Sequence, residues 1–69
     1  MIYKKNDIIK HRNDIVFVIT KVDKIKDNYR AVPLKQYQQG LGDMLTCIIK
    51  EEDIVKLIGR YTKYGTIIL

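Results

Sequence analysis

Sixty-nine residues are enough for one domain, so we expect residues 1–69 to form a single unit. Apolar residues make up 46% of the chain, which is ordinary for a folded protein and argues against disorder. A chain this short buries only roughly 60% of the surface that its unfolded form exposes, which leaves little to enclose a water-free active site. We therefore expect a protein that is not an enzyme and holds no cofactor or metal.

The net charge of +5 is placed unevenly along the chain. Residues 1–35 hold nine Lys and Arg against four Asp and Glu, whereas residues 36–69 hold four of each. An excess confined to one half indicates a positive face, which would attract nucleic acid or an acidic protein. A Lys-rich surface also serves solubility alone, and composition does not separate these two interpretations.

The single cysteine, Cys47, has no partner within the chain for a disulfide. Small secreted domains usually depend on disulfides, so its isolation favours a reducing compartment. No signal peptide is indicated after Met1, and the longest apolar run, Ile15 to Ile19, is far too short to span a membrane. The chain is therefore predicted to be cytoplasmic, with no membrane partner.

The first half of the chain predicts two strands in succession. The first covers Asp7 to Arg12 and ends at Asn13-Asp14, whose side chains can bond nearby backbone groups in a turn. The second, Ile15 to Val22, is almost wholly β-branched or aromatic, which suits a pleated surface. It should be the central strand of the core, with Phe17 in its most apolar stretch.

Two more strands and a loop follow. Tyr29 to Val32 is predicted to return as a hairpin partner after a turn at Asp27-Asn28. Pro33 lacks a backbone N–H and should therefore lie at a strand end, a bulge or an edge. Gln38 to Asp43 contains two glycines and is predicted to be a loop, and Met44 to Ile49 is predicted to be the fourth strand.

Residues 51–61 fit two structures equally well. Apolar residues at Ile54, Leu57, Ile58 and Tyr61 have the spacing of a helical stripe, with three acids ahead of them at the favourable end of the helix dipole. Gly59 interrupts that stripe, and residues 54–58 also match a short buried strand. The acids Glu51, Glu52 and Asp53 are better explained by capping a helical turn than by acid–base catalysis or a cation site.

The opening Asn6 to Ile9, the strand Val16 to Asp23, the return Tyr29 to Leu34 and the run Ile49 to Ile54 resemble small SH3-like barrels of bacterial and phage proteins. The resemblance covers residues 5–58. It implies a mostly-β, five-stranded barrel with a short helical turn near residues 51–58, of the 3₁₀ type, followed here by a C-terminal strand.

Two departures from this family matter. Asn6 stands where a glycine is usual, a change that asparagine tolerates because it enters the left-handed region more readily than most residues. The acidic-aromatic motif of signalling SH3 domains is missing, as is Trp, so recognition of proline-rich peptides is not supported. Because such barrels serve many unrelated functions, the resemblance alone assigns none.

His11 and Cys47 have simple structural explanations. His11 is the only histidine and is expected to be an exposed strand residue. Cys47 lies within an apolar strand and is expected to pack in the core as a small hydrophobic residue, because free cysteine is among the most buried residue types.

The basic half contains the best candidates for function. Tyr3, Tyr29 and Tyr37 are interleaved with its cations, and small barrels bind single strands by combining a positive groove with aromatic platforms. We therefore expect a binding module for nucleic acid, or alternatively one for protein, including self-association. The predicted nucleic-acid-binding residues are Lys4, Lys5, Lys10, Arg12, Lys21, Lys24, Lys26, Arg30 and Tyr29.

The tail from Thr66 to Leu69 holds three large apolar residues and is predicted to be a last strand. It would either pair with a strand of its own chain or join a second copy as a homodimer through residues 66–69. We favour the first, with Ile67 and Leu69 buried, because a short domain can least spare apolar area.

Overall fold

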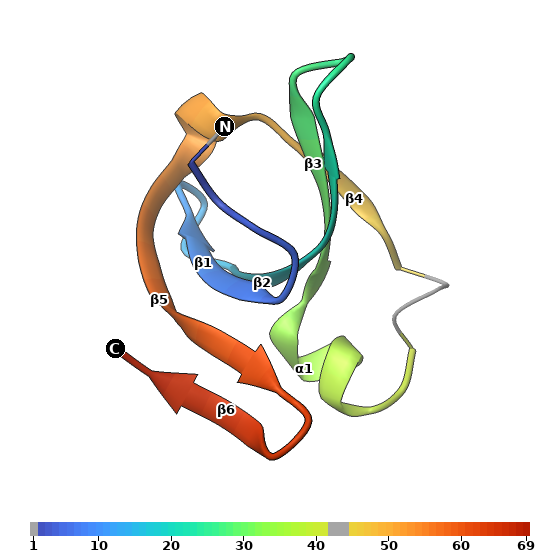
Figure 1. The fold of residues 1–69 in the computed structure, drawn as a ribbon, viewed down its shortest axis with the longest axis vertical. Helices are drawn as coiled ribbons and strands as arrows, with labels where there is room; N and C mark the ends of the chain where they lie inside the picture. Colours follow the sequence, from blue (N-terminus) through green and yellow to red (C-terminus); the bar gives the residue numbers. More distant parts are fainter. Residues whose placement is uncertain (1, 42–44) are drawn as a thin grey trace.

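The computed structural model describes residues 2–41 and 45–69, and these form one strongly curved antiparallel sheet (Figure 1). The order of strands across the sheet is β4-β3-β2-β1-β5-β6. The strands are β1 (Asp7–His11), β2 (Val16–Asp23), β3 (Asn28–Pro33), β4 (Cys47–Ile49), β5 (Ile54–Thr62) and β6 (Gly65–Ile68), joined by the α-helix α1 (Leu34–Gln38) and the 3₁₀ helix η2 (Glu51–Asp53).

The prediction of a mostly-β fold with a short helical turn and a C-terminal strand is confirmed. The sheet, however, is not closed, since β4 and β6 lie at its two ends. Closure would require these two end strands to pair with each other, and they do not pair in the described residues. β6 pairs with the second half of β5, from Gly59 and Ile68 to Thr62 and Gly65, and so forms the end of the sheet.

Asparagine and aspartate make the sharp turns of the first half. Asn6, Asp14 and Asp27 have φ values of 75°, 71° and 57°, in the left-handed region that these two residue types enter most readily. The predicted turn at Asn13-Asp14 is confirmed, and the second turn includes Asp27 as predicted but covers residues 24–27, because Asn28 already begins β3. The tolerance of asparagine at position 6 is also confirmed. The Asn13 side chain accepts a hydrogen bond from the Ile15 backbone N–H at 2.9 Å.

The boundaries of the middle segment differ from those predicted. Pro33 ends β3 as expected, but residues 34–38 then form α1, which no sequence pattern indicated. Five residues are too few to show a helical period, and Pro33 provides no capping side chain. The predicted strand from 44 to 49 is shorter, since β4 begins at Cys47; residues 42–44 lie outside the described part of the chain.

The structure decides between the two possibilities for residues 51–61. Only Glu51–Asp53 is helical, as η2, and Ile54–Thr62 is the strand β5. Gly59, which interrupts the helical stripe, is explained by its place in the strand. A Cβ atom at this position would lie 2.1 Å from the Ile67 carbonyl oxygen of β6, so the neighbouring main chain occupies the place of a side chain.

Apolar side chains are buried on both faces of the sheet. On one face Phe17 and Ile19 of β2 pack in the main core, whose buried members are Ile9, Phe17, Ile19, Tyr29, Ala31 and Ile49. On the other face Val18 lies opposite Ile8 and Val32, and all three are fully buried. The continuous apolar run of β2 therefore reflects its central place in the sheet, as predicted.

The tail pairs within its own chain, but its side chains are not buried. Residues 65–68 form the edge strand β6 on β5, and Ile67 remains 53% exposed. The prediction that Ile67 and Leu69 would be buried is therefore wrong. The physical reason is the place of β6 at the end of the sheet, where no further described element lies over it.

Candidate nucleic-acid interface

The eight predicted cations come from six parts of the first half of the chain. Lys4 and Lys5 precede β1, and Lys10 and Arg12 lie on β1 and in the turn after it. The remaining four belong to β2, β3 and the turn between them. We call residues 21–30 the basic hairpin; its cations are Lys21, Lys24, Lys26 and Arg30.

Lys10 and Arg12 are held by neighbouring carboxylates. The Lys10 ammonium lies 3.5 Å from Asp14, and the Arg12 guanidinium lies 3.2 Å from Asp53. The Arg12 backbone N–H also donates to the Asp53 carbonyl at 2.9 Å, which joins the β1–β2 turn to η2. The charges of these two cations are therefore partly neutralised within the chain.

In the described residues, the cations of the basic hairpin, like the exposed Lys4 and Lys5, have no such carboxylate beside their charged groups. Within residues 2–41 and 45–69, no carboxylate oxygen lies within 4.0 Å of the charged atoms of Lys21, Lys24, Lys26 or Arg30. All four side chains are exposed. Lys21 and Arg30 are moreover directly opposite each other on β2 and β3, an arrangement in which like charges destabilise a sheet. An anion between them would relieve that repulsion.

The turn of the basic hairpin is tightly constrained. The Asp23 carboxylate accepts a hydrogen bond from the Lys26 backbone N–H at 3.0 Å, and Asp27 closes the turn in the left-handed region. This hydrogen bond, aided by the nearby charges of Lys26 and Lys21, holds the pKa of Asp23 below its usual value. The loop from 24 to 27 is therefore organised before any ligand arrives.

Tyr29 belongs to the core and not to the surface. Its side chain is fully buried, and its hydroxyl donates a hydrogen bond to the Glu51 carboxylate while accepting one from the Tyr3 backbone N–H at 3.2 Å. Burial, together with the bond to Glu51, raises the pKa of Tyr29 to about 12. The hydroxyl in turn lowers the pKa of Glu51, which also accepts the Ile2 backbone N–H.

Among the described residues, the three tyrosines therefore form no aromatic platform beside the cations. Tyr29 has no exposed ring face for a base, and Tyr3 packs edge-on against it, with ring centroids 6.0 Å apart. Tyr37 of α1 packs in the same way against Tyr61 of β5, at 4.8 Å. The three tyrosines that the sequence places among the cations serve internal packing instead.

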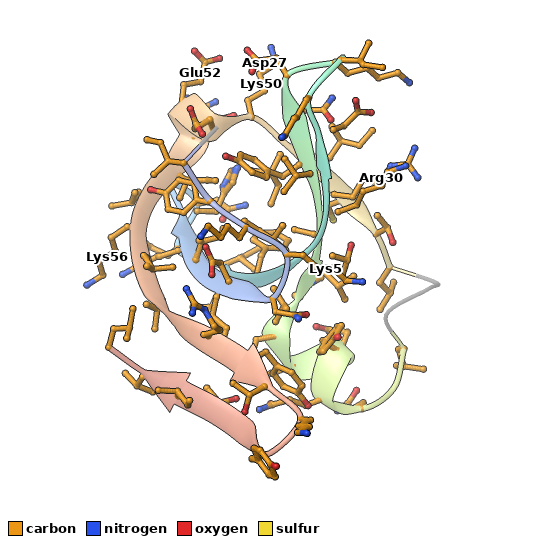
Figure 2. The ribbon with its side chains drawn as sticks, viewed as in Figure 1. Lys5, Asp27, Arg30, Lys50, Glu52 and Lys56 are labelled. Atoms are coloured by element: carbon orange, nitrogen blue, oxygen red, sulfur yellow. The ribbon has the colours of Figure 1, made fainter. Side chains whose placement is uncertain are left out.

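Lys50 lies close to the basic hairpin, although it is far away in the sequence. Figure 2 shows Lys50 beside Asp27 and Glu52 at the end of the molecule where the hairpin turns. These residues line a hollow of about 440 Å³ together with Lys26, Asn28, Ile48 and Glu51. Its two lysines face three carboxylates, so the hollow does not extend the positive surface. This grouping has no signal in the sequence, because Lys50 reaches the hairpin only through the pairing of β4 with β3.

His11 and Cys47, the other two candidate residues, differ in how far they are buried. His11 lies on β1 as predicted, but its ring is half-buried against Phe17 and not exposed, and its Nδ1 accepts the Asn13 backbone N–H at 3.2 Å. Cys47 is exposed, so its predicted burial is wrong. β4 is a three-residue edge strand, and only Ile49 of that strand reaches the core.

No protein family, curated protein or solved structure matches this chain. In the described part of the chain no three side chains among His, Cys, Asp and Glu are grouped so that they could hold a metal ion. The helices found in the same residues are too short or too polar to cross a membrane. Any assignment of function therefore depends on the geometry of the surface.

Proposed function

We propose that this protein is a non-catalytic binding module that holds nucleic acid through the basic hairpin. One observation carries the proposal: four exposed cations without an ion-pair partner in the described residues lie on a single hairpin, whereas Lys10 and Arg12 are paired with carboxylates. Outside the hairpin, further lysines also lack an ion-pair partner in the described residues, but they are spread over several other segments: Lys4, Lys5, Lys35, Lys50, Lys56 and Lys63. Unpaired cations gathered on one element fit a polyanionic partner better.

We further propose that the fold is an SH3-like one with an additional strand. Two features support this: the 3₁₀ helix η2 stands directly before β5, as the resemblance implies, and Asn6 adopts the left-handed conformation at the place of the usual glycine. The additional strand is β6. Such folds serve as binding scaffolds of many kinds, so the fold permits the proposed function without selecting it.

The contacts expected from the hairpin are with phosphate groups. Lysine and arginine that touch phosphate displace condensed counterions, so the affinity falls steeply as salt is added. Such contacts position a protein on nucleic acid without distinguishing one sequence from another. The module should therefore bind many sequences with similar affinity.

Reversing two charges of the hairpin tests this proposal. The double variant Lys21→Glu with Lys24→Glu should bind every oligonucleotide more weakly and to the same extent. The slope of log Kd against log salt concentration should become shallower by about 1 for each lost phosphate contact. Fluorescence anisotropy with labelled oligonucleotides over a salt series measures both quantities.

The matched control is Lys56→Glu with Lys63→Glu, which makes the same change in net charge on β5 and the turn after it. Figure 2 shows Lys56 on the side of the molecule opposite Arg30. The control should retain most of the affinity and the original slope. An equal loss in both variants would show that charge alone, and not the hairpin, attracts the ligand. Absence of any binding by the unaltered protein at low salt would remove the proposal.

A second function, self-association through residues 66–69, is favoured by a separate observation. Ile67, Ile68 and Leu69 are 53%, 64% and 76% exposed on and directly after the edge strand β6. An apolar edge strand is a template for pairing with another strand, and no charged residue occurs from 64 to 69 to discourage it. A second copy could add its own β6 there in antiparallel fashion.

Light scattering tests this alternative. If β6 joins two copies, the full chain should have the mass of a dimer, and deletion of residues 66–69 should give a folded monomer. If β6 serves only its own sheet, the full chain should be a monomer, and the deletion should lower the melting temperature without changing the mass. A monomeric full chain at high concentration would rule out the homodimer.

A further inference from the structure

The tip of the basic hairpin carries an apolar side chain that nothing in the fold explains. Ile25 is 97% exposed, the highest value among the large exposed hydrophobic residues of the described chain. It lies between Lys24 and Lys26, in a turn where polar residues are usual. Exposed apolar residues are common singly, but this one occupies the apex of the element that holds the unpaired cations.

The hairpin presents Ile25 in a defined way. Asp23 and Asn28 are the last paired residues of β2 and β3, so only residues 24–27 form the turn. The Asp23 carboxylate holds the backbone N–H of Lys26 directly after the apex. Figure 1 shows this turn projecting at one end of the molecule, beyond the neighbouring strands and opposite the turn between β5 and β6.

We propose that Ile25 inserts between stacked base pairs of duplex DNA from the minor groove, while Lys24 and Lys26 hold the phosphates on either side. The inference rests on the proposed function and adds to it the class of nucleic acid and the mode of contact. Proteins that bind the minor groove commonly insert an apolar side chain at a base step, which kinks the duplex and brings more of it to the basic surface. An exposed isoleucine between two lysines on a projecting hairpin has the chemistry and the position for that role.

The arrangement of aromatic residues favours duplex over single-stranded nucleic acid. Binding of single strands depends on aromatic rings that stack on splayed bases. Tyr29 is buried and Tyr3 packs against it, so neither provides such a surface at the hairpin. Tyr64 is 89% exposed, but it lies in the turn between β5 and β6, at the opposite end of the molecule in Figure 1.

The test measures unstacking and bending separately from binding. A short duplex carries the fluorescent base 2-aminopurine at a central TA step, which is among the most easily kinked, and a pair of dyes at its ends. The unaltered protein should raise the 2-aminopurine fluorescence and shorten the distance between the dyes. Ile25→Ala should still bind with an unchanged salt slope but lose both signals.

Val55→Ala is the matched control, because it truncates an exposed aliphatic side chain on β5, outside the basic hairpin and outside residues 66–69. It should retain both signals, and circular dichroism should show both variants folded. Binding of duplex by the unaltered protein with neither signal, or tighter binding to the single strand, would overturn the inference and leave the proposed function standing. Persistence of both signals in Ile25→Ala would also overturn it, whereas no binding of any nucleic acid would remove both proposals.

Discussion

Replacing Phe17 with alanine is expected to prevent stable folding. Phe17 is 4% exposed and belongs to the main core, where it also contacts the His11 ring edge-on, with centroids 5.7 Å apart. Truncating a buried phenylalanine typically costs about 3–5 kcal/mol in the free energy of unfolding. Small domains have a total of only about 5–15 kcal/mol, and a short chain lies near the lower end of that range.

Circular dichroism followed during heating or urea titration would measure this effect. The control is Phe17→Leu, which keeps most of the volume and should cost less than about 1.5 kcal/mol. That variant should melt cooperatively at a somewhat lower temperature. A Phe17→Ala protein that is soluble and melts cooperatively near the temperature of the unaltered chain would contradict the assignment of the core.

Replacing Gly59 with alanine is expected to detach β6 from β5. The added Cβ would lie 2.1 Å from the Ile67 carbonyl oxygen and 3.0 Å from the Ile68 Cα, and both are main-chain atoms of β6. A flexible side chain could turn aside, but a paired strand can move only by breaking its hydrogen bonds. Overpacking of this kind costs about 1–3 kcal/mol or more.

Hydrogen exchange together with a thermal melt would measure the outcome of Gly59→Ala. The amide of Leu69, which donates to the Ile58 carbonyl at 2.9 Å, should lose its protection, while amides of β1 and β2 should keep most of theirs. Val55→Ala changes an exposed residue of the same strand and should leave the protection of β6 unaltered. Unchanged protection of Leu69 in Gly59→Ala would mean that β6 can shift without separating.

The first half of the fold was predictable from the sequence because its signals are local. A run of β-branched and aromatic residues forms β2, and the turns at Asp14 and Asp27 use residue types that accept a positive φ. Those preferences act within a few residues of the chain. The strands and the turns of residues 7–33 were therefore identified, with boundaries correct to within one or two residues.

Residues 51–61 were ambiguous because long-range pairing produces their pattern. The pairing of β5 with β1 is irregular at two places, between Ile8 and Ile9 and between Lys10 and His11 of β1. At each place β5 has one extra residue, Ile58 and Val55, with no partner on β1. Each extra residue interrupts the strict alternation of a strand, and the apolar residues then acquire a spacing that resembles a helix. Only the presence of β1 alongside shows that the segment is a strand.

The candidate site shows the same division between local and tertiary information. The sequence alone determines the number of cations, their concentration in residues 1–35 and the position of Ile25 between two lysines. The tertiary structure decides whether Arg12 has an ion-pair partner, because Asp53 reaches it only when η2 lies beside the β1–β2 turn. The burial of Tyr29 against Glu51 and the exposure of Cys47 on an edge strand likewise depend on which strands become neighbours. Residue type sets what a side chain can do, but the packing of distant segments determines whether it meets solvent.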